Sequence, residues 1–399
     1  MSRLESIFQT VRRIIVKNKY KSDNRNTNLW LFGEWFGKSC CDNSLYLANY
    51  IKTNYPNIKV VWVTLPKTDL SLLNNNIDVV YFDSENIKKV FSEAGVVVFN
   101  QNFKDFSIEG YNYFDGAIII NLWHGVPWKK IGYDASRKHG IIHEISIRIN
   151  DYIDNSSLYL VQSERNADCL KTAYKISSDK LLRSGSPRNS IFHSSIKQKE
   201  ERNKLLDVLK MRGFDLGINP YFIVYMPTFR DSTSRVYDIT SLSHNDELNK
   251  WMNENNIFIL QKSHFASAGT FKSNCDNNRI FLFNDFSATE LMAASNMLIT
   301  DYSSCFFDYL IMNKPIIHYL YDYQFYRNDD RGLYYKYEDV VCGDVAWNEE
   351  EMISFIVMNY QDGKRNEDLR KIRFQEYVTY ESPYSCQNVV DAINMRLEK

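Results

Sequence analysis

The strongest candidate for acid–base chemistry in this sequence is a histidine that follows an apolar segment. His124 lies in the run WHGVPWKKIG at residues 123–132, directly after the apolar segment 117–122. A histidine held in a tight turn at the end of a strand can take a proton from a hydroxyl near neutral pH. A single histidine is more often structural, but the glycine, proline and lysines beside this one favour a general base.

A second candidate site follows the apolar segment 297–300. Here Asp301, a tyrosine, Ser303 and Ser304 form the run DYSS, and a helical pattern comes next. Free backbone amides at the start of a helix and serine hydroxyls can donate to phosphate oxygens. An ordinary N-cap at Ser303 or Ser304 explains the same pattern equally well.

Other polar residues in the second half also suit an anionic ligand. Each follows a predicted strand, directly or in the loop after it, and each alone is weak evidence, because a polar or basic residue there is usually just solvated. They are Thr228, Arg230, Lys262, His264 and Arg331. Together they favour a binding site for phosphate groups on one edge of a sheet.

Several common motifs are missing from the sequence. There is no G-x-G-x-x-G and no G-x-x-x-x-G-K-[ST], so no dinucleotide or Walker-type loop is expected. There is no H-E-x-x-H or other metal cluster, and no G-x-S-x-G elbow of a hydrolase. We therefore predict neither a cofactor nor a metal.

The composition is that of a folded, cytoplasmic protein. The chain has 399 residues, with 48 Lys and Arg against 49 Asp and Glu, which argues against nucleic-acid binding. No apolar run reaches about 18 residues, and no secretory signal is visible. The seven cysteines show no C-x-x-C spacing, so we expect reduced thiols.

Short apolar runs alternate with amphipathic segments, a pattern typical of parallel sheets covered by helices on both faces. Strands are predicted at 29–32, 60–63, 79–82, 96–99, 117–122, 158–161, 221–225, 257–261, 280–283, 297–300 and 315–319. Helices are predicted at 44–53, 85–94, 164–174, 197–212, 248–254, 288–295, 304–312 and after residue 348.

The turn-rich region near 185–220 predicts a domain boundary. It contains the run GSPRN at 185–189 and two later glycines before Pro220. We expect one Rossmann-like domain at 23–195 and another at 196–399, facing a central cleft at the carboxyl ends of their strands. Residues 1–22 carry six basic side chains beside an apolar stripe. They predict a helix that lies on an anionic membrane or docks on its own domain.

These runs together resemble the CDP-glycerol glycerophosphotransferase family, the primases and polymerases of wall teichoic acid and related capsules. The similarity covers residues 90–390, and residues 1–90 match more loosely. It rests on WHGVP with KKIG, MPTFRD at 226–231, TDYSS at 300–304, FDY at 307–309, KPI at 314–316 and RG at 331–332.

The resemblance implies a GT-B fold with an acceptor-side N-terminal domain and a donor-binding C-terminal domain. It implies transfer of a polyol phosphate, above all glycerol phosphate, from a CDP-activated donor to a hydroxyl of a lipid-linked or growing polymer, with release of CMP. The family association also favours a peripheral position on the inner face of the bacterial membrane, with the basic helix at 1–22 on lipid.

The resemblance also implies residue roles. His124 corresponds to the general base, and His264 to the histidine that contacts the donor phosphates and helps the leaving group. Ser303, Ser304 and Arg331 correspond to phosphate contacts, and Arg188 in GSPRN is a further candidate. The chain departs from the family at Phe265, where proline is common, and at Phe229, where tryptophan is usual.

Two alternatives stay open at this point. The first is a GT-B glycosyltransferase that uses a nucleotide sugar, which differs in the atom attacked and not in the fold. The second is a non-catalytic donor-binding scaffold in a capsule assembly complex. The presence of both His124 and His264 argues against the scaffold.

Overall fold

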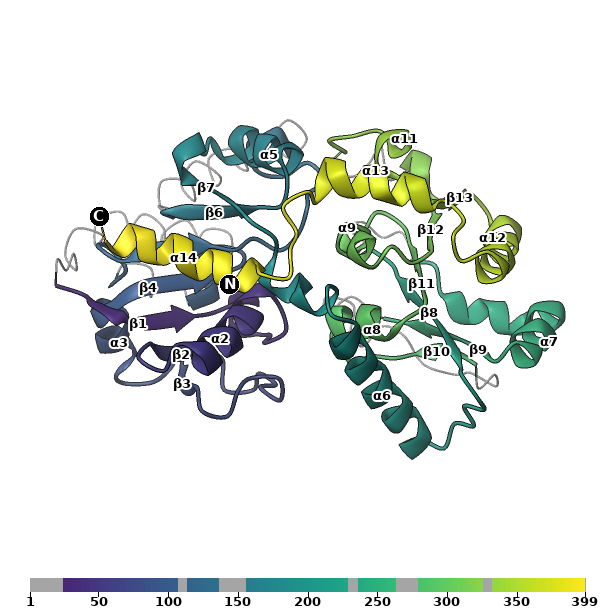
Figure 1. Ribbon diagram of the computed structural model, residues 1–399, viewed down its shortest axis with the longest axis horizontal. Coiled ribbons are helices and arrows are strands. Elements are labelled where there is room, and N and C mark those ends of the chain that lie inside the picture. Colours follow the sequence, from purple (N-terminus) through teal and green to yellow (C-terminus); the bar gives the residue numbers. More distant parts are fainter. Residues whose placement is uncertain are drawn as a thin grey trace. The chain divides into compact units, whose positions relative to one another are not determined.

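The computed structural model describes residues 24–106, 113–135, 156–228, 236–262, 279–325 and 332–398. The chain forms two compact units, each with its own sheet (Figure 1). Unit 1 comprises Met1–His124, Ile131–Ser190 and Tyr380–Lys399, and unit 2 comprises Gly125–Lys130 and Ile191–Thr379. The predicted helix at 1–22 lies outside the described residues.

Unit 1 contains a seven-stranded parallel sheet in the order β3-β2-β1-β4-β5-β6-β7. The strands are β1 (Asn26–Phe32), β2 (Lys59–Thr64), β3 (Asp78–Tyr81), β4 (Ala94–Phe99), β5 (Ile118–Asn121), β6 (Leu158–Val161) and β7 (Leu181–Arg183). The central strand β4 is buried along its whole length, as expected for a parallel strand with helices on both faces.

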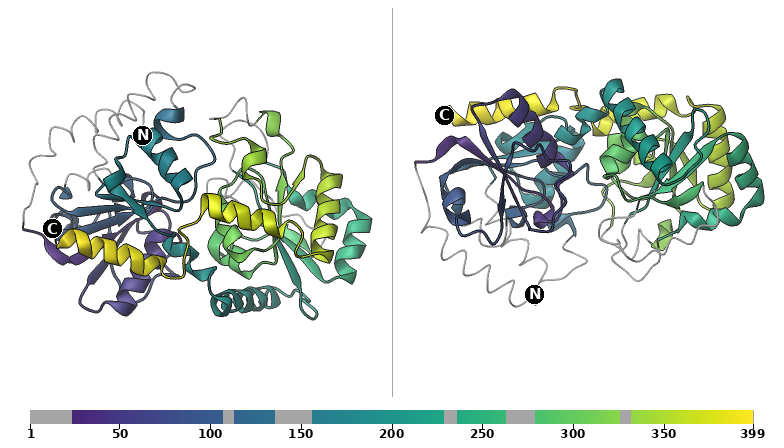
Figure 2. Two further views of the ribbon diagram at one scale, coloured as in Figure 1. Left: turned by 45° about the horizontal axis from the view of Figure 1, so that its top comes forward. Right: turned by 90° about the horizontal axis from the view of Figure 1, so that it is seen from below.

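Helices cover both faces of this sheet. On one face α2 (Asn43–Asn54) and α14 (Ser385–Leu397) bury their apolar sides against the strands. On the other face lie α3 (Ile87–Glu93) and the 3-10 segment Phe103–Phe106, while α5 (Glu164–Tyr174) packs beside β6. The two views of Figure 2 show α14, in yellow, against the purple and blue elements of unit 1.

Unit 2 contains a six-stranded parallel sheet in the order β10-β9-β8-β11-β12-β13. The strands are β8 (Tyr221–Met226), β9 (Ile257–Gln261), β10 (Ile280–Leu282), β11 (Met297–Thr300), β12 (Ile316–Tyr319) and β13 (Asp344–Ala346). Its strands run 3-2-1-4-5-6 in chain order, which is the Rossmann arrangement. The doubly wound α/β class expected from the sequence is therefore confirmed.

The helices of unit 2 also form two layers. α6 (Ser195–Met211), α8 (Ala288–Ala294) and α9 (Cys305–Tyr309) share one core with the sheet, and α7 (Asp246–Glu254) and α12 (Glu349–Gln361) share the other. α11 (Tyr337–Val340) and α13 (Glu367–Tyr377) complete the described helices. Across the described residues, no helix combines the length and the apolarity that a membrane crossing requires.

The domain boundaries differ from those expected at 23–195 and 196–399. The segment Tyr380–Lys399 belongs to unit 1, because α14 buries Val389, Val390 and Ile393 in the core beside α2. The segment Gly125–Lys130 belongs to unit 2, where the Trp128 indole donates to the Tyr335 carbonyl oxygen at 3.1 Å. Short polar turns in the sequence indicate where one element ends and the next begins. They do not show which sheet a distant helix will cover.

Candidate active site

His124 lies at the carboxyl end of β5, as predicted. The turn before it places Trp123 in the left-handed region at φ 54°, and the Asn121 side chain accepts from the Trp123 amide at 2.9 Å. The Asn43 amide group donates to the Trp123 carbonyl oxygen at 3.0 Å from the start of α2. Two side-chain amides therefore fix the backbone that carries the imidazole.

Two aromatic rings pack against the His124 imidazole. The Trp123 ring stacks on it with a centroid separation of 4.6 Å, and the Trp35 ring lies at 5.5 Å. The His124 Nδ1 atom is 3.4 Å from the Asn100 carbonyl oxygen, which can only accept, so this contact places a proton on Nδ1. The Nε2 atom is then the proton acceptor, and burial lowers the pKa of His124 from its ordinary value of 6.5.

A buried ion pair lies beside the histidine. The Arg188 Nη1 atom donates to Asp42 Oδ1 at 2.5 Å, and Arg188 Nη2 donates to the His124 carbonyl oxygen at 3.1 Å. Asp42 Oδ2 accepts from the Trp35 indole at 2.8 Å. The sequence predicts a phosphate contact for Arg188. That role stays a prediction, and the structure places its guanidinium against Asp42 and the His124 backbone.

Sequence reasoning missed two further buried carboxylates in this cluster. Glu34 accepts from the backbone amides of Cys41 and Asp42, and burial raises its pKa well above the ordinary range. Asp105 accepts from the Phe36 and Gln101 amides, both at 2.8 Å, and burial raises its pKa to about 6. Their position just after predicted strands is the signal that could have identified them.

The backbone around His124 is strained. Trp35, Phe36 and Trp123 are not glycines, yet they adopt φ values of 46°, 60° and 54° in the left-handed region. Such conformations cost about 1–3 kcal/mol each and persist only where surrounding contacts hold them. Here the Asp105 carboxylate holds the Phe36 amide, and Asp42 holds the Trp35 ring.

In unit 2, Asp301 joins the carboxyl ends of two neighbouring strands. Its Oδ1 atom accepts from the Thr228 amide at 2.8 Å and from the Tyr302 amide at 2.6 Å. The Thr300 hydroxyl donates to the Met226 carbonyl oxygen at 2.7 Å. The structure therefore brings together Thr228 and Asp301, two of the residues predicted from separate motifs.

The predicted serines lie at the start of α9. The Ser303 hydroxyl accepts from the Cys305 amide at 3.5 Å, and within the described residues the Ser304 hydroxyl caps no backbone amide. Both side chains are partly exposed, as donors to a bound ligand must be. Lys262, at the end of β9, donates from Nζ to the Asn284 carbonyl oxygen at 3.1 Å.

Three of the predicted site residues lie outside the described residues, namely Arg230, His264 and Arg331. In the part of the chain that the structure describes, no group of three or more His, Cys, Asp or Glu side chains is arranged to hold a metal ion.

The two Rossmann-like sheets, with polar residues at the carboxyl ends of their strands, define a protein of the GT-B fold class. The structure matches the wall teichoic acid polymerase TagF with a TM-score of 0.80 at 20% identity, over 100% of this chain and 99% of that chain. It also matches the UDP-GlcNAc 2-epimerase of Neisseria meningitidis with a TM-score of 0.57 at 12% identity, over 92% of this chain and 99% of that chain.

The family follows from the sequence comparison. The model of the CDP-glycerol:poly(glycerophosphate) glycerophosphotransferase family matches residues 15–395, so the chain belongs to this family. The resemblance inferred from the separate motifs is therefore confirmed, and it extends over almost the whole chain.

Characterised relatives share about a quarter of their residues with this chain. A teichoic acid poly(glycerol phosphate) polymerase of Staphylococcus epidermidis is 26% identical over 82% of this chain and 44% of its own length. One of Bacillus spizizenii is 28% identical over 92% of both chains. A teichoic acid glycerol-phosphate transferase of Staphylococcus aureus is 22% identical over 97% of this chain and 99% of its own. The chain thus spans less than half of the first relative and nearly all of the other two.

Proposed function

We propose that this protein transfers glycerol phosphate from CDP-glycerol to a hydroxyl group of a teichoic-acid-type or capsule-type polymer and releases CMP. The observation that carries the proposal is the family match over residues 15–395. The His124 imidazole supports it, because donation from Nδ1 to the Asn100 carbonyl oxygen leaves Nε2 as the atom that can accept a proton.

In the proposed reaction the acceptor hydroxyl gives its proton to His124 Nε2 and attacks the phosphorus distal to cytidine. A new P–O bond forms to the acceptor, and the bond to the CMP oxygen breaks in line with it. Negative charge develops on the transferred phosphoryl group and on CMP. Preorganised donors lower the energy of that charge most effectively.

We propose that the predicted residues of unit 2 supply these donors. Ser303 and Ser304 contribute hydroxyls at the start of α9, and Thr228 and Lys262 contribute a hydroxyl and a cation at neighbouring strand ends. Asp301 acts by holding backbone amides, because a carboxylate would repel phosphate. We propose that Arg230 and Arg331 contact the donor phosphates and that His264 assists the departing CMP.

The same proposal includes the acceptor molecule and the location of the protein in the cell. We infer a lipid-linked saccharide or polyol-phosphate chain as acceptor, and a peripheral position on the inner face of the bacterial membrane. The six basic side chains in residues 1–22 support contact with anionic lipid.

The test is release of CMP by the purified protein. CDP-glycerol and CDP-ribitol are offered separately, with and without a lipid-linked acceptor. We expect acceptor-dependent CMP from CDP-glycerol, and a fall in kcat of about 10²–10⁴-fold for His124→Ala. His244→Ala, at an exposed histidine of unit 2, serves as the matched control and should keep full activity.

Other outcomes would identify another function. Turnover of a nucleotide sugar in place of CDP-polyols would make the protein a glycosyltransferase. Binding of CDP-glycerol without turnover, unchanged in His124→Ala, would favour a donor-binding scaffold.

A further inference from the structure

The Asp42–Arg188 pair is unusual because it is almost fully buried. The exposed fractions of the two side chains are 7% and 10%, and the atoms Arg188 Nη1 and Asp42 Oδ1 are 2.5 Å apart. A buried ion pair is often no more stabilising than an apolar pair of the same size, because both charges lose their hydration. Stability alone therefore does not explain why the chain has two opposite charges here.

Both members of the pair contact the surroundings of His124. Arg188 holds the His124 carbonyl oxygen, and its own backbone amide donates to the Asn43 side chain at 3.1 Å. Asp42 holds the indole of Trp35, whose ring borders the imidazole. The pair thus acts on the histidine from two sides, through its backbone and through a neighbouring ring.

The turn that carries Arg188 is itself fixed by the C-terminal segment. Glu381 Oε1 accepts from the Ser186 amide at 2.8 Å, the Asn189 side chain at 2.9 Å and the Gln162 side chain at 2.7 Å. A Cβ atom at Gly185 would lie 2.3 Å from the Ser385 hydroxyl, so this segment approaches the turn closely. Arg188 therefore has little freedom to move towards another ligand.

We propose that Asp42 and Arg188 are positioning residues that hold the His124 imidazole in place and balance the charge beside it. The inference rests on the proposed function, in which His124 is the general base. It assigns Arg188 to the histidine in place of the donor phosphates.

The charged groups around the histidine act in opposite directions. Burial lowers the pKa of His124, the Asp42 carboxylate raises it, and the Arg188 guanidinium lowers it. Among the described residues, Glu34, after β1, and Asp105, in the 3-10 segment, both interact with Asp42, and the Cys40 and Cys41 thiols lie beside Glu34. Removing one charge of the pair leaves the other uncompensated.

The experiment compares Asp42→Asn with Arg188→Gln. We expect the apparent pKa of His124 to fall in Asp42→Asn and to rise in Arg188→Gln, because the two charges act on it in opposite directions. We expect kcat to fall roughly 10- to 100-fold in both, because the imidazole loses its fixed orientation. The KM for CDP-glycerol should stay within about twofold of the wild-type value.

Two readouts keep the inference separate from the proposed function. The acid limb of kcat/KM against pH, measured by turnover, reports the pKa of the base in the free enzyme. NMR titration of labelled histidines, with the His124 signal assigned by its loss in His124→Ala, reports the same pKa without any substrate. If the wild-type protein releases no CMP, the proposed function fails, and the NMR titration still tests the charge pair.

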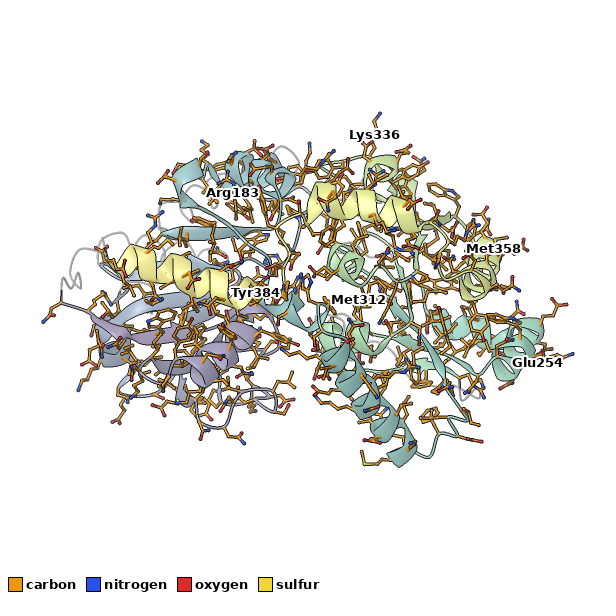
Figure 3. The ribbon with its side chains drawn as sticks, viewed as in Figure 1. Arg183, Glu254, Met312, Lys336, Met358 and Tyr384 are labelled. Atoms are coloured by element: carbon orange, nitrogen blue, oxygen red, sulfur yellow. The ribbon has the colours of Figure 1, made fainter. Side chains whose placement is uncertain are left out.

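Control variants address folding. Arg183→Gln removes the exposed partner of Glu164 on the same unit and should move neither readout; Arg183 is labelled in Figure 3. The double variant Asp42→Asn with Arg188→Gln removes both buried charges together. It should return the His124 pKa to near the wild-type value while kcat stays low. The inference would be overturned if the His124 pKa stayed unchanged or moved in the same direction in the two single variants. A rise in KM with unchanged kcat would overturn it as well.

Discussion

At the scale of single residues, the proposed chemistry depends on keeping one imidazole neutral. The His124 ring packs against two indoles and the Asn100 carbonyl oxygen, and burial lowers its pKa. A neutral imidazole is the form that can accept a proton from a hydroxyl. The surrounding apolar rings therefore serve the proposed reaction by disfavouring the charged form.

This environment predicts the pH dependence of turnover. A base with a lowered pKa loses its activity only when the pH falls below that lowered value. The acid limb of kcat/KM for CDP-glycerol should therefore have its midpoint below pH 6.5, the ordinary value for histidine. Initial rates of CMP release, measured between about pH 4.5 and 8, would give this midpoint, because the range covers the titration of histidine. A midpoint at or above 6.5 would contradict the structure, provided that circular dichroism shows the fold intact throughout.

The contacts that assist His124 were harder to predict than the histidine itself. Arg188 and Asp42 are 146 positions apart in the chain, and Asp105 and Phe36 are 69 apart. Motif spacing identifies residues at strand ends, which is why His124 and Asp301 could be found. It does not show which distant side chain will pair with which, because that depends on how the strands are ordered in the sheet.

At the scale of elements, apolar runs predicted most of the described strands, including the edge strands β3 and β10, but missed the edge strands β7 and β13. Apolar runs at 29–32 and 96–99 correspond to the buried strands β1 and β4. β7 and β13 were missed because each has only two apolar residues, whereas β10, also three residues long and at an edge, lies in a continuous apolar run. The helix expected at 304–312 begins at Cys305 and changes to a 3-10 turn at Leu310.

The turn after the WHG run allows a test at this scale. Gly132 has φ 51°, and a Cβ atom there would lie 2.2 Å from the Ala173 carbonyl oxygen of α5. A left-handed conformation costs an L-residue about 1–2 kcal/mol, and the contact with backbone adds to it. We expect Gly132→Ala to lower the free energy of unfolding by about 2 kcal/mol or more in urea titrations.

The matched control is Gly363→Ala. No atom lies within 4 Å of the Cβ position at Gly363, so this variant should stay within about 0.5 kcal/mol of wild type. Equal losses of unfolding free energy in the two variants would show that the close approach at Gly132 does not determine which residue the turn accepts.

At the scale of the whole molecule, the position of an element in the chain does not determine the unit to which it belongs. The C-terminal helix α14 follows every strand of unit 2 in sequence but completes the core of unit 1. Figure 1 shows it lying along the purple and blue strands. Glu381, four residues before this helix begins, holds the turn that carries Arg188. The segment that leads into α14 therefore supports the surroundings of His124.

This arrangement predicts that a substitution near the C-terminus destabilises the N-terminal sheet. Ile393 is fully buried in the same core cluster as Leu47 and Ile51 of α2, whereas Met395 on the same helix is 65% exposed. Truncating a buried isoleucine to alanine costs about 2–5 kcal/mol. We expect Ile393→Ala to speed amide hydrogen exchange in β1, β2 and β4 while β8, β9 and β11 keep their protection, and Met395→Ala to change neither set. Faster exchange in unit 2 alone would mean that α14 belongs, in solution, to the unit that precedes it in sequence.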